Sequence, residues 1–240
     1  MITQLRKCVH LSHYRAAGLL GAAVLLCSSA ALALSLADLT EKDANAGLKS
    51  AMEQGSVAAV AKLGAANGFL NNDKVRIKLP GKFDKVRSVL QLTGQGQKID
   101  DLELAMNRAA ESAVPMAKPL LISAVKSMTF NDAKNILAGG ETSVTDFFRE
   151  KTAASLAVKF LPLVKGVTDK AKLAQSYNSV MSKAQTLGLA SDQEATVEAY
   201  VTKKAAEGLY VMIAEEEKAI RRDPVGTGSK IIGKVFGALK

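Results

Sequence analysis

The sequence predicts an all-α fold, a single irregular bundle of about eight helices. Apolar residues recur with helical spacing through most of the chain, and only one short stretch, near residues 74–80, alternates as a strand does. Aromatic residues make up 5% of the 240 residues, against 48% for all hydrophobic types, so the core is expected to be aliphatic. Three helix starts carry a capping signature, Ser or Thr followed three residues later by an acid: Thr40 with Asp43, Thr129 with Asp132, and Ser191 with Glu194.

Residues 1–33 have the three parts of a secretory signal peptide. Basic residues and no acid open the segment, and an apolar run from Ala16 to Ala33 follows. The run ends in a small-x-small pattern that a signal peptidase accepts. We therefore expect an exported protein in the periplasm of a Gram-negative envelope.

Two other fates of this leader are considered. The apolar run approaches the roughly 20 residues of a membrane-spanning helix, which would make it an uncleaved anchor; Ser28, Ser29 and the Ala-x-Ala end favour cleavage. Lipid attachment at Cys27 is disfavoured, because Leu26 stands where lipoprotein signals have a small residue.

Loss of the leader would remove several chemistries from the protein. Residues 34–240 hold no Cys, His or Trp, since the only cysteines and histidines are Cys8, Cys27, His10 and His13. Disulfides, thiol catalysis, thiolate zinc sites and a Ser–His nucleophile are then excluded, and no metal or cofactor is expected. Basic residues outnumber acidic ones, 32 to 23, but the two are interspersed, so no nucleic-acid partner is expected.

The helices are expected in eight ranges, with a physical reason for each main break: 41–64, 81–92, 98–126, 130–138, 143–160, 163–187, 192–222 and 229–239. The Asn67-Gly68 pair stops the first helix, and Pro115 and Pro119 should kink or split the third, because each removes an intrahelical donor. Gly139-Gly140 ends the fourth. Asp223-Pro224 ends the seventh.

The alternating stretch at residues 74–80 is expected to be an extended edge segment, because Pro80 closes it. No low-complexity linker divides the chain, so residues 34–240 are expected to form one domain.

Several short motifs follow one another along the chain. They include Gly68-Phe69-Leu70-Asn71, Met106-Asn107-Arg108-Ala109-Ala110-Glu111, Met128-Thr129-Phe130, Phe147-Phe148-Arg149 and Ala214-Glu215-Glu216-Glu217, of which the second and the third are fairly specific. In this order, over roughly residues 36–237, the chain resembles the exported bacterial family catalogued as domain of unknown function 4197. Lys78 stands where that family usually has a second proline, and Asp223 where it usually has Asn. The resemblance implies a mostly helical envelope protein and brings no activity, substrate or cofactor.

The first candidate site is Glu103, Asn107 and Glu111, which follow one another at four-residue spacing on one helix. Two carboxylates and an amide in line are oxygen ligands for Ca²⁺ or Mg²⁺, or an acid–base pair for glycan hydrolysis. The alternative is a solvated helix flank that carries N-cap and inter-helix hydrogen bonds, and it is preferred.

The second candidate is the helix at 192–222. Its apolar arc places Glu215 inside, Glu217 toward solvent and Glu216 at the other side of the arc. A desolvated carboxylate needs a partner, and Arg108 or Arg149 is expected to provide it. The group is interpreted as an ion pair that fixes helix docking, with a ligand-binding or acidic site as the alternative.

The C-terminal helix at 229–239 is amphipathic, with lysines beside an apolar stripe of Ile232, Val235, Phe236 and Leu239. Peripheral contact with anionic lipid is one interpretation, and packing back on the domain is preferred.

The function expected from the sequence is a non-enzymatic binding or scaffold module for an unknown small molecule, lipid or envelope protein. A carboxylate-dependent hydrolase of cell-wall glycan and a lipid-binding or membrane-surface protein are the alternatives. No catalytic residue is assigned. The candidate binding residues are Glu103, Asn107, Arg108, Glu111, Arg149, Glu215 and Glu216.

Overall fold

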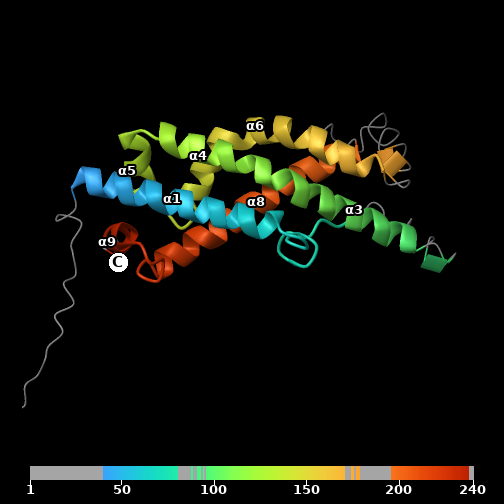
Figure 1. Cartoon of the computed structure of the whole chain (residues 1–240), viewed down its shortest axis with the longest axis horizontal. Helices are drawn as coiled ribbons and strands as arrows, with labels where there is room; N and C mark the ends of the chain where they lie inside the picture. Colours follow the sequence, from blue (N-terminus) through green and yellow to red (C-terminus); the bar gives the residue numbers. More distant parts are fainter. Residues whose placement is uncertain are drawn as a thin grey trace, which may run out of the picture. The chain divides into compact units, whose positions relative to one another are not determined.

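The long helices α1, α3, α6 and α8 lie side by side (Figure 1). The computed structural model describes residues 40–80, 88, 91–92, 94, 96–170, 174–175, 177–178 and 196–237. The named elements are α1 (Glu41–Gly64), α3 (Gln97–Ala113), a 3₁₀ turn (Val114–Met116), α4 (Ala117–Ser127), α5 (Phe130–Ala138), α6 (Ser143–Thr168), α8 (Val197–Arg222) and α9 (Lys230–Gly237). The predicted all-α class is confirmed, and the described residues contain no strand.

Two of the predicted helix starts are confirmed by their caps. Thr40 Oγ1 accepts a hydrogen bond of 3.1 Å from the Asp43 N–H at the start of α1. At α5 the bonds are reciprocal: Thr129 Oγ1 accepts from the Asp132 N–H at 3.1 Å, and Asp132 accepts from the Thr129 N–H at 2.9 Å. These bonds satisfy amide donors that have no partner within the helix.

The start predicted for α8 is wrong. The helix begins at Val197 and not at residue 192, because Thr196 caps it with a 3.1 Å hydrogen bond from the Ala199 N–H. Ser191 lies outside the described residues, as do the predicted helix at 81–92 (except residues 88 and 91–92) and most of 163–187.

The prolines act in two different ways. Pro115 lies in the 3₁₀ turn that separates α3 from α4, so the predicted split of the third helix is confirmed. Pro162 lies inside α6, which runs unbroken to Thr168, so the separate helices predicted at 143–160 and 163–187 are wrong. The carbonyl left without a donor belongs to Val158, which is 75% exposed and open to water, while Phe160 and Val164 are fully buried and hold the helix.

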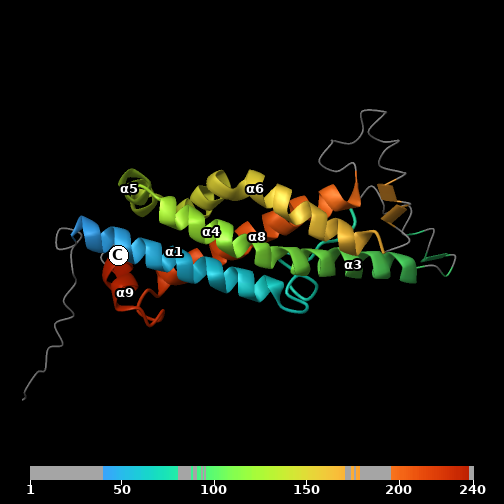
Figure 2. The ribbon, with the colours of Figure 1, turned by 45° about the horizontal axis from the view of Figure 1, so that its top comes forward.

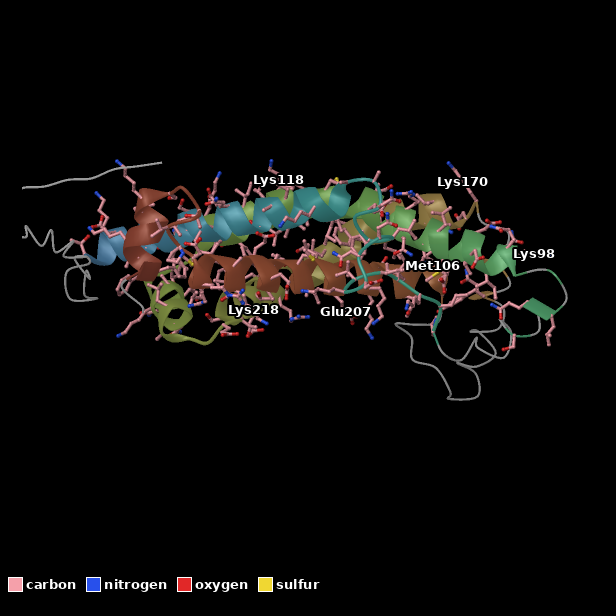
Figure 3. All side chains as sticks on the ribbon, turned by 90° about the horizontal axis from the view of Figure 1, so that it is seen from below. Lys98, Met106, Lys118, Lys170, Glu207 and Lys218 are labelled. Carbon is pink, nitrogen blue, oxygen red and sulfur yellow. The ribbon has the colours of Figure 1, made fainter. Side chains whose placement is uncertain are left out.

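The core lies between the long helices. α6 and α8 pack against each other, α3 packs against both, and α1 packs against α4, α8 and α9, as the turned view also shows (Figure 2). Met106 of α3 points into this interior, whereas Lys118 and Lys170 project outward (Figure 3). Large aromatic side chains, among them Phe69, Phe148 and Phe160, are also fully buried, so the core is less purely aliphatic than expected.

The C-terminal helix α9 packs back on the domain. Its residues Ile232, Val235 and Phe236 are buried, and Lys234 Nζ forms an ion pair of 2.7 Å with Asp43 of α1. Gly47 permits the close approach: a Cβ there would overlap Val235 and lie 2.9 Å from the Ile231 carbonyl oxygen. The apolar stripe considered for lipid contact is therefore covered by the protein itself as far as Phe236.

Within the described ranges, no helix is both long and apolar enough to cross a bilayer. The predicted signal peptide at 1–33 lies outside the described residues.

Candidate functional site

The polar row of α3, Glu103, Asn107 and Glu111, is buried and faces the extended segment that follows α1, so the predicted solvated flank is wrong. Asn107 pairs with Ile77 twice: Oδ1 accepts from the Ile77 N–H at 2.9 Å, and Nδ2 donates to the Ile77 carbonyl at 2.8 Å. Glu103 Oε1 accepts from the Leu79 N–H at 3.0 Å. The row thus forms hydrogen bonds with the extended segment of the kind that a neighbouring strand forms with an edge strand.

Glu111 continues the same pattern at the loop. Its Oε1 accepts from the N–H groups of Phe69 and Leu70, at 3.1 and 3.3 Å. Its Oε2 accepts from Arg108 at 2.6 Å, and Arg108 also donates to Asn67 Oδ1 at 2.7 Å. Asn67 has a φ of 67°, in the left-handed region that Asn tolerates, so the side chain of Arg108 braces the turn.

The chemical role of this cluster follows from its contacts. The structure does bring together the predicted residues Glu103, Asn107, Arg108 and Glu111. The polar atoms of the row hold backbone groups within residues 69–79, and Arg108 holds the side chain of Asn67. A glycan hydrolase needs two carboxylates facing an open cleft, and Glu103 and Glu111 are each 5% exposed. In the part of the chain that the structure describes, no group of three or more His, Cys, Asp or Glu is placed to hold a metal ion.

The acids of α8 are arranged differently from the prediction. Glu215 is partly exposed, with 39% of its side chain accessible, and forms an ion pair with Lys74. The hydrogen bond and the charge of Lys74 lower the pKa of Glu215. Its predicted burial and its predicted partners, Arg108 or Arg149, are therefore wrong. Glu216 pairs with Lys62 of α1 at 2.5 Å.

Glu217, predicted to face solvent, is the buried acid of α8, with 5% exposure. It accepts hydrogen bonds of 3.0 Å from the N–H groups of Val144 and Thr145, and one of 2.9 Å from the Thr145 hydroxyl. Arg221, one turn further along α8, donates to it at 3.1 and 3.2 Å. Glu217 therefore binds the N-terminus of α6, where free amide donors and the helix dipole favour an anion.

Arg149 stands apart from these acids. Its guanidinium carbon lies 4.6 Å from the centre of the Tyr210 ring, a cation–π contact between α6 and α8. Tyr210 is buried, and its hydroxyl forms a 2.9 Å hydrogen bond with Thr152. Burial raises the pKa of Tyr210, while the hydrogen bond with Thr152 and the charge of Arg149 act in the opposite direction.

A groove begins beside Arg149 and Tyr210 and separates the outer faces of α6 and α8. It has a volume of about 470 Å³. Its walls are mostly apolar and are built from the small or aliphatic side chains of Ala153, Ala157, Leu161, Ala199 and Ala206. We call this hollow the α6–α8 groove.

Polar side chains of α8 complete the α6–α8 groove. Lys203 and Glu207, one helical turn apart, lie along it, and Figure 3 shows Glu207 on the outer side of α8. Thr202 also lines the groove; it is 6% exposed, and its buried hydroxyl oxygen has no hydrogen-bond partner among the described residues.

Sequence reasoning did not find this groove. It picked out Arg149 as an ion-pair partner and not as part of a binding surface. The available signal was the run of small residues at helical spacing on α6, Ala153 and Ala157, which leaves room where a larger side chain would fill the gap between two helices.

Comparison with known proteins gives one match. The sequence model of a family described as "Protein of unknown function (DUF4197)" matches residues 38–237. No curated protein and no solved structure matches the chain. The match covers most of the chain and all of its named helices. The protein therefore belongs to this family, whose description assigns it no function.

Proposed function

We propose that the protein is an exported envelope module that binds an apolar ligand in the α6–α8 groove and performs no chemistry on it. The observation that carries the proposal is the groove itself, about 470 Å³ with mostly apolar walls. Binding sites for small molecules are typically hollows of about 300–1,000 Å³ lined by apolar side chains with a few polar groups.

The contacts of the carboxylates argue against the hydrolase alternative. Glu103 and Glu111 are occupied by backbone donors, and Glu215 by Lys74. A general acid needs a proton and a free path to the substrate. These three carboxylates instead serve to hold the extended segment and the loop in place.

Among the described residues, the hollow inside the bundle gives no support to a lipid carrier with an internal cavity. The hollow between α1, α6 and α8, beside Met52, Phe148 and Ile213, has a volume of only about 20 Å³. That is room for about one water molecule and none for an acyl chain. The ligand-binding space that supports a binding role is the open α6–α8 groove.

Location in the envelope rests on the leader predicted at residues 1–33. N-terminal sequencing of the protein from a periplasmic extract should give a chain that starts at Leu34. Recovery of the protein with Met1 in the cytoplasmic fraction would overturn this part of the proposal.

The groove is tested with Nile red, a neutral apolar dye whose fluorescence rises when it leaves water. The wild-type protein should bind it, and Ala157→Trp, which fills the groove, should abolish binding. Ala154→Trp is the matched control, since Ala154 is an exposed neighbour on α6 that does not line the groove. Equal binding by all three proteins would show that the dye site lies elsewhere.

A further inference from the structure

We propose that the natural ligand class of the α6–α8 groove is a single-chain amphiphile with an anionic head, such as a fatty carboxylate or a monoalkyl phosphate. The inference rests on the proposed function and adds the polarity of the ligand. Arg149, at one end of the groove, receives the head; Lys203 adds positive charge further along α8, and the alanine-rich walls receive the tail.

The groove has the length and direction for such a chain. α6 and α8 run antiparallel: Arg149 meets Tyr210 at one end, and Thr168 bonds Glu198 at 3.1 Å toward the other. Arg149 and Leu161, both in the groove wall, are twelve residues apart on α6, which is about 18 Å of helix. Leu161 is 44% exposed, so the apolar end of the groove is open to a tail.

The charges along the groove favour an anion. Glu207, the one acid in the wall, is already paired with Lys204 at 2.7 Å. Neither Arg149 nor Lys203 forms an ion pair within the described part of the chain; Arg149 rests on the Tyr210 ring, which fixes its guanidinium at the groove edge. Among the described residues, two cations thus border an apolar surface whose one acid is paired with Lys204, the complement of an amphiphile with a negative head.

The test is displacement of Nile red by four amphiphiles below their micelle concentrations: dodecyl phosphate, laurate, dodecyl maltoside and dodecyltrimethylammonium. The two anions should displace the dye at concentrations about tenfold lower than the neutral maltoside, as expected for a partly exposed ion pair with Arg149 beside the further positive charge of Lys203. The cation should be weakest. The comparison of dodecyl phosphate with laurate shows which anionic head binds more tightly.

Charge variants locate the head. The double variant Arg149→Gln with Lys203→Gln should lose the preference for anions and keep the affinity for dodecyl maltoside. Lys159→Gln is the matched control, an exposed cation of α6 outside the groove wall.

The outcomes separate the two proposals. Equal displacement by all four heads, a preference for the cation, or an anion preference that survives the double variant would overturn the anionic ligand and leave the groove proposal standing. If the wild-type protein binds no Nile red and none of the amphiphiles, in a direct titration followed by calorimetry, both proposals fall.

Discussion

The side-chain amide of Asn107 pairs with both backbone groups of Ile77, at 2.9 and 2.8 Å, as a neighbouring strand would. Replacement of Asn107 by Leu leaves a buried N–H and a buried carbonyl without partners. Each costs about 1–3 kcal/mol, so Asn107→Leu should reduce the free energy of unfolding by about 3 kcal/mol. Urea denaturation measures the loss. Ser112→Ala, on the exposed side of the same helix, should change stability by less than about 0.5 kcal/mol, and equal effects would refute the pairing.

The acids of α8 offer a second test, because two neighbours differ in burial. Glu217→Ala removes the anion that holds the N-terminus of α6 and leaves Arg221 without its partner, which should cost about 3–5 kcal/mol. Glu216→Ala breaks only the partly exposed ion pair with Lys62, which should cost about 1 kcal/mol or less. Thermal melting of both variants checks the order, and a larger loss for Glu216→Ala would mean that the burial of the two acids is reversed.

Two helical glycines should respond to alanine in opposite directions. A Cβ at Gly208 would lie 2.7 Å from Phe69 Cε1, and Phe69 is fully buried, so Gly208→Ala should destabilise by about 1–3 kcal/mol. Gly166 has no atom within 4 Å of such a Cβ, so Gly166→Ala should stabilise α6 by up to about 1 kcal/mol. The measurement is again chemical denaturation, and stabilisation by both changes would contradict the packing of Phe69 on α8.

The ion pair between α1 and α9 should make stability depend on acid pH. The hydrogen bond from Lys234, followed by that from Thr40, lowers the pKa of Asp43 below its usual 3.8. A lowered pKa means that the carboxylate stabilises the fold above pH 3.8, and that this contribution is lost as the pH falls through the pKa of the folded state. The difference in melting temperature between wild type and Asp43→Asn should be present at neutral pH and vanish in strong acid. In a Lys234→Gln background the difference should shrink at every pH; an undiminished difference would show that Lys234 is not the partner.

Short sequence motifs predicted helix starts correctly where the interactions that fix the start join residues close together in the sequence. The caps at Thr40 and Thr129 are short-range hydrogen bonds, and α1 and α5 begin where those residues predict. The prediction at Pro162 was wrong because the free-energy cost of a proline inside a helix depends on burial. It is high only where the carbonyl that loses its N–H donor is buried. The exposure of Val158 is a property of the packed structure, which the sequence around Pro162 does not show.

The candidate site was predicted in part. The spacing of Glu103, Asn107 and Glu111 does place them in one row, but only the path of residues 67–79 shows what the row holds. Glu215 was predicted to be buried and Glu217 exposed, and the structure shows the reverse. The error has a simple cause. A helix wheel assumes one narrow buried face, whereas α8 contacts α1, α3 and α6, so its buried residues spread over a wide arc and the apolar residues alone do not define its exposed side.

The packing of α9 against Gly47 affects the order in which the protein can fold. The part of α1 around Gly47 is completed by residues 231–236, which the ribosome delivers some 180 positions later. α1 also packs on α4 and α8, but this end of it is covered only when the last stretch of the polypeptide arrives. A chain that stops before residue 231 would therefore leave the surface around Gly47 open to water.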